Sequence, residues 1–195
     1  VRPARMGDRR ARQVFPAFPG VIRVCLHGAE STGKSVLASK LERELGIPWV
    51  PEYGRAYAET QGTDFTMADL LAIAAGQDAA MRAASSDRPP LLLLDTDPLM
   101  TAAWAEMLFG HAPAELFTYP RADHYLLFDP DVPWVADGTR FFGTDEARAR
   151  FAALAEEMLV HAGVPFERVS GSWAEREARV RALLGKWIVG ESPPP

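Results

Sequence analysis

Eight residues near the start of the chain narrow the range of possible folds sharply. Gly28–Ser35 reads Gly-Ala-Glu-Ser-Thr-Gly-Lys-Ser and fits the pattern G-x4-G-K-[ST]. In this pattern two glycines let the backbone turn tightly, so that successive N–H groups point at phosphate oxygens. An apolar run precedes the motif at Val21–Leu26, and a helical pattern follows it. Strand, glycine-rich loop and helix in this order predict a phosphate-binding loop (P-loop) at a helix N-terminus.

The rest of the chain alternates short apolar runs with longer helical stretches, which is typical of a parallel sheet covered by helices. A length of 195 residues allows one such domain. We therefore expect an α/β protein of the P-loop NTPase fold, with a five-stranded parallel sheet, helices on both faces and a basic lid. The predicted strands are 21–26, 48–50, 90–95, 124–128 and 165–169, and the predicted helices are 34–45, 66–84, 98–109, 145–161 and 173–184.

The two ends of the chain are predicted to lie outside this domain. Residues 1–20 carry five arginines without an apolar stretch behind them, so we expect a flexible basic extension rather than a targeting signal. The P-loop domain is expected at 21–187, and 188–195 is a Pro-rich tail. The net charge of −5 argues against a nucleic-acid partner, and no apolar run is long enough to span a membrane. The lone Cys25 excludes a disulfide framework and favours a cytoplasmic setting.

The P-loop implies ATP and Mg²⁺ as cofactors. Lys34 is expected to reach the β- and γ-phosphates, and the Ser35 hydroxyl to bind Mg²⁺ together with Asp95, which ends an apolar inner strand. Gly171-Ser172-Trp173 follows the last strand, where adenine commonly lies in this architecture, although Ser172 and Glu175 also fit a helix capping box. The predicted nucleotide-binding residues are Gly28, Ala29, Glu30, Ser31, Thr32, Gly33, Lys34, Ser35, Val36, Gly171, Ser172 and Trp173.

The acceptor side is predicted from acidic and aromatic residues. Glu52 follows the short second strand, where a carboxylate can take the proton of an attacking hydroxyl; alternatively it is a surface residue paired with Arg55. Asp97 is a second carboxylate at the end of strand 90–95 and can accept from both hydroxyls of a ribose. The predicted acceptor-binding residues are Glu52, Tyr53, Arg55, Gln77, Asp97 and Trp104, with Glu52, Asp97 and Lys34 also predicted to be catalytic.

Arginines after the fourth strand predict a cationic lid over the phosphates, since small-molecule kinases close such a loop to exclude water. Arg140 and Arg148 are the candidates, with Arg150 as an alternative. Arg148 and Arg150 cannot share one helix face, so we expect only one of them to reach phosphate. The chain is too short for an AAA-type module with an additional helical domain, and it has no guanine-specifying N-K-x-D motif, which leaves a small-molecule kinase as the favoured class.

Four further blocks carry a resemblance to a known family: Glu52–Arg55, Asp95–Asp97, Trp134–Arg140 and Gly171–Arg176. With the P-loop, in this order and spacing, the chain from about residue 21 to residue 186 resembles the ribosylnicotinamide kinase domain of NadR-type proteins. The resemblance implies ATP-dependent phosphorylation of the 5'-hydroxyl of nicotinamide riboside to its mononucleotide, a step of NAD salvage. One departure is Ala136, where the family pattern has an acidic residue.

Family members are often fused to an adenylyltransferase domain, and some carry a DNA-binding domain. We expect neither in this chain, because neither fits in residues 1–20 and because the sequence lacks the adenylyltransferase motif H-x-G-H. Two alternatives to nicotinamide riboside phosphorylation stay open. One is a kinase of another small acceptor, such as a deoxynucleoside, a nucleoside monophosphate or a sugar acid; the other is a regulatory ATP-binding module. The sequence does not indicate an oligomeric state, and the expected partner is a small-molecule nucleoside.

Overall fold

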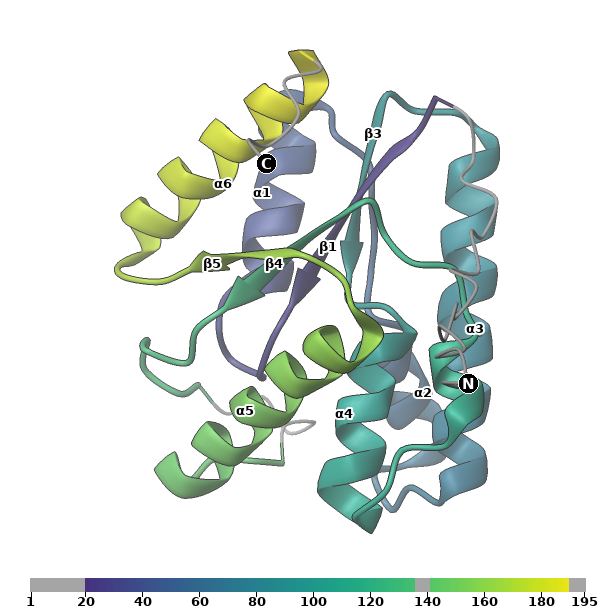
Figure 1. Ribbon diagram of the computed structural model, residues 1–195. Coiled ribbons are helices and arrows are strands. Elements are labelled where there is room, and N and C mark those ends of the chain that lie inside the picture. The colour runs from purple at the N-terminus through teal and green to yellow at the C-terminus, as the bar shows by residue number, and fades with distance from the viewer. Residues whose placement is uncertain (1–19, 136–140, 190–195) are drawn as a thin grey trace, which may run out of the picture.

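Five parallel strands form one sheet in the computed structural model, which describes residues 20–135 and 141–189 (Figure 1). The strand order is β2-β3-β1-β4-β5. In this order β1 is central, and Leu26 of β1 lies opposite Asp95 of β3. The loops that leave β1 and β3 therefore start side by side at one edge of the sheet. The strands are β1 (Ile22–His27), β2 (Trp49–Val50), β3 (Leu91–Asp95), β4 (His124–Phe128) and β5 (Phe166–Val169).

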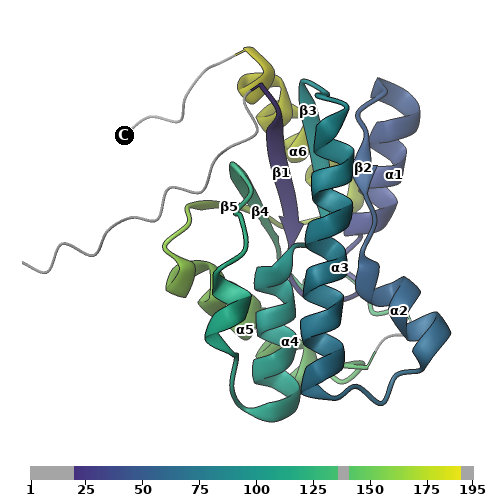
Figure 2. The ribbon, with the colours of Figure 1, turned by 90° about the vertical axis from the view of Figure 1, so that its right-hand side faces the viewer.

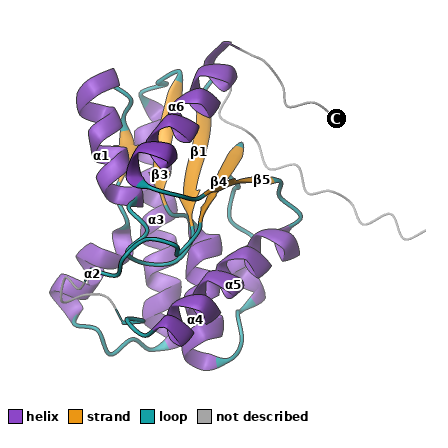
Figure 3. Ribbon diagram, turned by 90° about the vertical axis from the view of Figure 1, so that its left-hand side faces the viewer, coloured by secondary structure: helices purple, strands orange, loops and turns teal. Residues whose placement is uncertain are grey.

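Helices cover both faces of the sheet, which makes the three-layer arrangement predicted from the sequence. One face packs against α1 and α6, and the other against α3, α4 and α5 (Figures 2 and 3). Because both faces are covered, all five residues of β3 are buried, as its continuous apolar sequence predicts. The helices are α1 (Lys34–Leu45), α2 (Tyr53–Gln61), α3 (Met67–Ser86), α4 (Pro98–Phe109), α5 (Asp145–Ala162) and α6 (Trp173–Val189), with a 3₁₀ turn η1 (Ala114–Phe117).

The central strand β1 contributes to both halves of the core. Val24 and Leu26 pack towards α1 and α6, whereas Cys25 packs towards α3, α4 and α5. His27 continues the second set, since successive side chains of a strand point to opposite faces, and its ring nitrogen Nε2 lies 2.9 Å from the carbonyl oxygen of Ala155 in α5. The strand is thus anchored on both sides immediately before the glycine-rich loop begins.

All the predicted strands and helices are confirmed to within a few residues. The structure also contains two elements that the sequence did not indicate. The missed elements are α2 and η1. Helix α2 buries only Ala58 and contains a glycine, so it lacks the apolar periodicity by which helices are found. Helix α6 also runs five residues further than predicted, to Val189. In the described part of the chain, no helix is both long and apolar enough to cross a bilayer.

Candidate functional site

The glycine-rich loop between β1 and α1 is shaped by two glycines in conformations that other residues rarely adopt. Gly28 has φ 124° and Gly33 has φ 86°. A Cβ atom at Gly28 would lie 2.6 Å from the carbonyl oxygen of Phe128, and one at Gly33 would lie 2.3 Å from the ring of Trp173. Both positions therefore need glycine for its backbone freedom and for its lack of a side chain.

Lys34 extends over the loop that precedes it. Its Nζ donates to the carbonyl oxygens of Gly28 at 2.8 Å and Ala29 at 2.7 Å. Burial lowers the pKa of Lys34, while the carboxylates of Asp95 and Glu52 oppose that effect. The ammonium is thus held at the mouth of the loop, where the oxygens of a bound phosphate can exchange with the carbonyls as its acceptors.

Ser35 and Asp95 meet at the predicted metal site. The Ser35 side chain lies close enough to the Asp95 carboxylate to lower its pKa, and this carboxylate is only 2% exposed at the end of β3. Burial raises the pKa of Asp95, and Lys34 counters this most strongly. A hydroxyl and a carboxylate are the hard oxygen donors that Mg²⁺ prefers, and a divalent cation would neutralise a carboxylate that has lost its water. The two side chains therefore fit Mg²⁺.

A cavity of about 330 Å³ opens beside the loop. At its polar end lie Lys34, Ser35, Glu52 and Arg55, and at its other end lies a group of aromatic side chains. Such a division suits an acceptor with a reactive polar group and a flat ring. The wall is completed by Gly28, Glu30, Ser31, Thr32, Gly33, Val36, Gly54, Ala58, Phe65, Leu70, Ile73, Gln77, Thr96, Met100, Thr101, Trp104, Phe141 and Phe151.

Glu52 faces this cavity from the N-terminal end of α2, where it is the N-cap residue. Its pKa is raised to about 7, first by burial and then by the negative charge of Asp95, against the opposing positive charges of Lys34 and Arg55. A carboxyl group with a pKa near neutrality is suited to accept a proton in a reaction at physiological pH. Arg55 acts electrostatically on Glu52, as the predicted pairing implies, but Glu52 lines the cavity. Its catalytic role stays a prediction.

Two of the predicted acceptor residues line the cavity in different ways. Trp104 presents its ring at the aromatic end. Gln77 is fully buried, and its amide already serves the backbone: Oε1 accepts from the N–H of Tyr53 at 2.7 Å, and Nε2 lies 3.5 Å from the carbonyl oxygens of Pro51 and Thr96. Gln77 therefore holds the chain on both sides of Glu52. Tyr53 itself packs against Gly76, is 39% exposed and is not among the cavity-lining residues.

Asp97 does not line the cavity either, although it was predicted to bind ribose. Its carboxylate accepts from the Tyr125 hydroxyl at 2.6 Å and from the Leu99 N–H at 3.0 Å, where it caps α4. Burial raises its pKa, and the hydrogen bond from Tyr125 opposes the rise. The sequence placed Asp97 at the correct edge of the sheet, but the buried tyrosine turns the side chain into the core. This geometry supports a structural role instead of contact with an acceptor.

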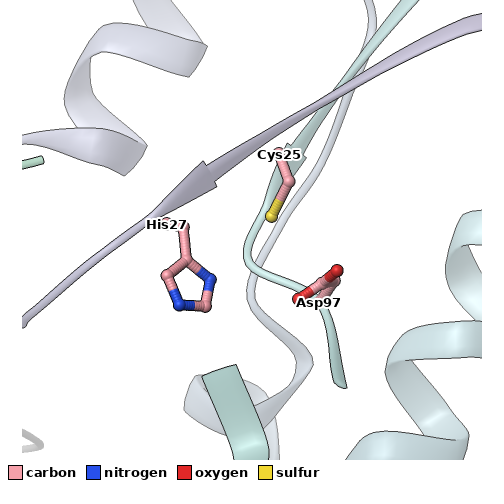
Figure 4. A group of neighbouring side chains, drawn as sticks. All are labelled: Cys25, His27 and Asp97. Carbon is pink, nitrogen blue, oxygen red and sulfur yellow. The ribbon is translucent and has the colours of Figure 1, made fainter. Parts of the chain in front are cut away.

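Cys25, His27 and Asp97 lie together behind the P-loop, with their side chains pointing into one buried space (Figure 4). Burial lowers the pKa of His27 to about 3 and raises that of Cys25. Their possible ligand atoms all lie within 4.8 Å of one another. Because Asp97 already has two donors, we assign the group to packing.

Two of the three arginines considered for the lid, Arg148 and Arg150, lie on α5. Arg140 lies outside the described residues. Arg148 is buried in α5, where its Nη2 donates to the carbonyl oxygen of Val132 at 2.9 Å and its guanidinium lies 5.6 Å from the centre of the Trp134 ring. It is not among the residues that line the cavity. In this structure Arg148 therefore fastens the segment after β4 to α5, while Arg150 is exposed.

The predicted adenine-side residues lie beside the P-loop. Trp173 is half exposed and contacts Gly33. The capping box is confirmed: the Ser172 N–H and hydroxyl both donate to the Glu175 carboxylate, at 2.8 and 2.7 Å. The N–H of Gly171 donates to the Asp131 carboxylate at 2.7 Å. These contacts order the loop that precedes α6 and leave the Trp173 ring available at its rim.

Sequence reasoning missed one buried arginine and two aromatic residues. Arg176 is 1% exposed, and its guanidinium donates to the carbonyl oxygens of Thr32 at 3.4 Å and Asp129 at 2.9 Å. It thereby joins the P-loop to the end of β4. Phe65 and Phe141 line the cavity from loops. Arg176 ends the Gly171–Arg176 block, which marked it as part of the family pattern but gave it no role. Phe65 and Phe141 carry no periodic signal, so only tertiary contacts identify them.

Together, the sheet order, the glycine-rich loop and the meeting of Lys34, Ser35 and Asp95 define a P-loop nucleotide-binding domain. A protein-family model described as "AAA domain" matches residues 23–176, and the chain belongs to that family. The chain length set aside only AAA-type modules with an additional helical domain, so this match does not conflict with that expectation. Within the described residues only α6 follows the last strand.

The chain is also homologous to NadR, which confirms the resemblance carried by its motifs. It is 31% identical over 174 residues to the trifunctional NAD biosynthesis/regulator protein NadR of Escherichia coli K12, and 30% identical over 178 residues to that of Salmonella typhimurium. Each match covers 86% of this chain and 42% of the relative. The chain therefore spans less than half the length of these curated relatives.

Solved structures show the same fold. A NadR protein in complex with NR superposes with a TM-score of 0.70 at 22% identity, covering 91% of this chain and 54% of that one. A thymidylate kinase from Candida albicans superposes with a TM-score of 0.63 at 15% identity, covering 85% and 91%. The five-stranded parallel sheet with helices on both faces is thus shared with the NadR protein and with this thymidylate kinase.

Proposed function

We propose that this domain is an ATP-dependent kinase that transfers the γ-phosphoryl group of ATP to the 5'-hydroxyl of nicotinamide riboside, giving nicotinamide mononucleotide. One observation carries the proposal. A carboxyl group with a pKa near 7, that of Glu52, lies in the same cavity as the P-loop residues Lys34 and Ser35. The homology to NadR and the nicotinamide riboside complex of a structural neighbour support the choice of acceptor.

The phosphate end of the cavity supplies charge and donors. The N–H groups of residues 28–35 and the positive end of α1 would surround the β- and γ-phosphates, with Lys34 moving from the loop carbonyls to phosphate oxygens. Ser35 and Asp95 would hold Mg²⁺, which when bound supplies positive charge to the phosphates. Trp173, on the rim beside Gly33, is our candidate for contact with adenine.

At the reacting centre, Glu52 would accept the proton of the 5'-hydroxyl as its oxygen attacks the γ-phosphorus. The bond between that phosphorus and the bridging oxygen of ADP breaks, ADP leaves, and the carboxyl releases its proton to solvent. Arg55, in electrostatic contact with Glu52 and lining the same end, would keep the carboxylate oriented. We infer that Gln77 acts indirectly, by holding the backbone on both sides of Glu52.

The aromatic end suits the other half of the acceptor. Trp104 lies 5.3 Å from Phe141 and 4.9 Å from Phe151, measured between ring centres. The nicotinamide ring of the riboside carries a positive charge, and a cation is attracted to the face of an aromatic ring, most strongly to tryptophan. We therefore place the nicotinamide beside Trp104 and the ribose between it and Glu52.

Several further assignments remain proposals. They are the domain limits 21–187, a phosphate contact by Arg140, a lid formed after β4, and the absence of a nucleic-acid or membrane partner. A cytoplasmic setting is proposed because the reaction consumes ATP and because Cys25 is a free thiol.

A coupled assay of ADP release tests the proposed acceptor. The panel comprises nicotinamide riboside, the common deoxynucleosides, thymidine monophosphate and a sugar acid, with Lys34→Ala as the control for contaminating kinases. We expect nicotinamide riboside to give the highest kcat/KM. Robust turnover of another acceptor with none of nicotinamide riboside would replace the acceptor and leave the kinase assignment standing. Slow ADP release that no acceptor accelerates would instead favour a regulatory ATP-binding module.

A further inference from the structure

Two side chains of the P-loop reach across to the chain that follows β4. One carboxylate oxygen of Glu30 accepts from the N–H groups of Phe141 and Phe142, at 3.1 and 3.2 Å. The hydroxyl oxygen of the neighbouring Ser31 accepts from the N–H of Val135 at 2.8 Å. Consecutive residues of the phosphate-binding loop thus hold this segment at two points. Neither contact uses the backbone N–H groups that a P-loop directs at phosphate.

We propose that Glu30 is a positioning residue for acceptor binding, which it serves by fixing Phe141 in the wall of the cavity. The proposal rests on the proposed function for the identity of the acceptor, but its geometry does not. The motif requires no carboxylate at this position, since the intervening residues of G-x4-G-K-[ST] are free to vary. A carboxylate beside a phosphate site repels the negatively charged phosphate. We therefore expect Glu30 to make a favourable contact that compensates for this repulsion.

Packing covers Phe141 only in part, so the backbone contact with Glu30 adds to what holds it in place. Its side chain is 37% exposed, although it lines the cavity. It meets Trp104 edge to face, with ring centres 5.3 Å apart, and lies 5.9 Å from Phe65. The next residue, Phe142, packs between Trp104 and Phe151 at 5.1 and 4.8 Å. One Glu30 oxygen accepts from both backbone N–H groups and thereby fixes the position of Phe141 in the cavity wall.

The arrangement couples the two ends of the cavity. Glu30 lies in the loop that would bind phosphate and lines the cavity. It also accepts from the backbone N–H groups of Phe141 and Phe142, in the aromatic wall that would hold the acceptor ring. Removing the carboxylate should therefore weaken binding of the acceptor far more than binding of ATP. Damage to the P-loop itself would instead weaken ATP binding first.

Steady-state kinetics of Glu30→Ala and Glu30→Gln test this role in the full chain. Hydrogen bonds to a carboxylate are stronger than those between neutral groups, so losing two should raise the KM for the phosphoryl acceptor about tenfold or more. The KM for ATP should change less than about threefold. Glu30→Gln should fall between, because an amide oxygen still accepts but carries no charge. Glu157→Ala, an exposed acidic residue on α5, is the matched control and should behave as wild type.

A double-mutant cycle ties the effect to Phe141. Phe141→Ala should raise the acceptor KM to a similar extent, and Glu30→Ala/Phe141→Ala should be no worse than the poorer single variant, because both remove the same wall. Multiplicative effects in the double variant would overturn the proposal. So would a Glu30→Ala variant in which the KM for ATP rises as much as the KM for the acceptor.

Hydrogen–deuterium exchange keeps the test independent of the acceptor's identity. The amides of Phe141 and Phe142 should exchange at least tenfold faster in Glu30→Ala than in wild type, while those of β3 stay protected and report an intact fold. Equal exchange at 141–142 in the two proteins would refute the contact even if nicotinamide riboside proved to be the wrong acceptor. If it is wrong, the kinetic comparison is run with whichever nucleoside the wild type phosphorylates.

Discussion

Replacing Glu52 by glutamine should cost activity and increase stability, with both effects depending on pH. Glutamine keeps the shape of the side chain but cannot take a proton. We expect turnover to fall about 10²- to 10⁴-fold, with ATP affinity preserved, if Glu52 is the general base. In wild type the activity should rise as pH increases through about 7, where the carboxylate forms, and this acidic limb should be absent from the variant.

The stability effect follows from the same environment. The pKa of Glu52 in the folded protein is about 7, against an ordinary value of 4.5. Between these values the folded protein holds a proton that the unfolded chain has lost, so the free energy of unfolding decreases as pH rises. Above pH 7 the full penalty is about 3.5 kcal/mol at about 1.4 kcal/mol per pH unit, and partial exposure of the side chain reduces it to about 1–3 kcal/mol.

Urea denaturation of wild type and Glu52→Gln at pH 5 and pH 8 measures this difference. We expect the variant to be more stable by about 1–3 kcal/mol at pH 8 and by much less at pH 5. Because Glu59 is exposed on the same helix, Glu59→Gln is the matched control and should change neither stability nor turnover. Equal stability of wild type and Glu52→Gln at both pH values would refute the raised pKa of Glu52. Unchanged turnover would refute its role as general base.

The remaining predictions concern the P-loop and the residues behind it. Lys34→Ala should abolish ADP release while leaving the circular dichroism spectrum unchanged, because the ammonium binds phosphate rather than the core; residual acceptor-dependent turnover would contradict this. Gly33→Ala should eliminate ATP binding in calorimetry, since its Cβ would lie 2.3 Å from the Trp173 ring at a φ of 86°; wild-type affinity would show that the loop is not rigid. Asp97→Asn should lower stability by about 1–3 kcal/mol in thermal denaturation, because one donor, Tyr125 or the Leu99 N–H, would face an amide NH₂; an unchanged melting temperature with a raised acceptor KM would restore the ribose role.

The sheet and the phosphate end of the site were predictable from the sequence because their signals are local. An apolar strand, two glycines and a lysine lie within a few residues of one another, and the pairing of Leu26 with Asp95 follows once both strands are parallel neighbours. Glu52 could be placed near the loop by the same reasoning, since the carboxyl ends of parallel strands share an edge.

The acceptor end could not be predicted in the same way, because it is set by side-chain packing between distant segments. Asp97 was expected to face ribose, but Tyr125, 28 residues later, draws its carboxylate into the core. Arg148 was expected over phosphate and instead donates to the carbonyl oxygen of Val132. Phe141 lines the cavity while its backbone N–H donates to Glu30, which lies more than 100 residues away in the sequence.

Calorimetric titration with a non-hydrolysable ATP analogue tests the central claim, that the turn before α1 enfolds the end of a triphosphate. We predict one site per chain, with affinity that depends on Mg²⁺ and is lost in Lys34→Ala. Heat of binding that is the same with Mg²⁺, with chelator and in Lys34→Ala, or no binding under any of these conditions, would contradict the account.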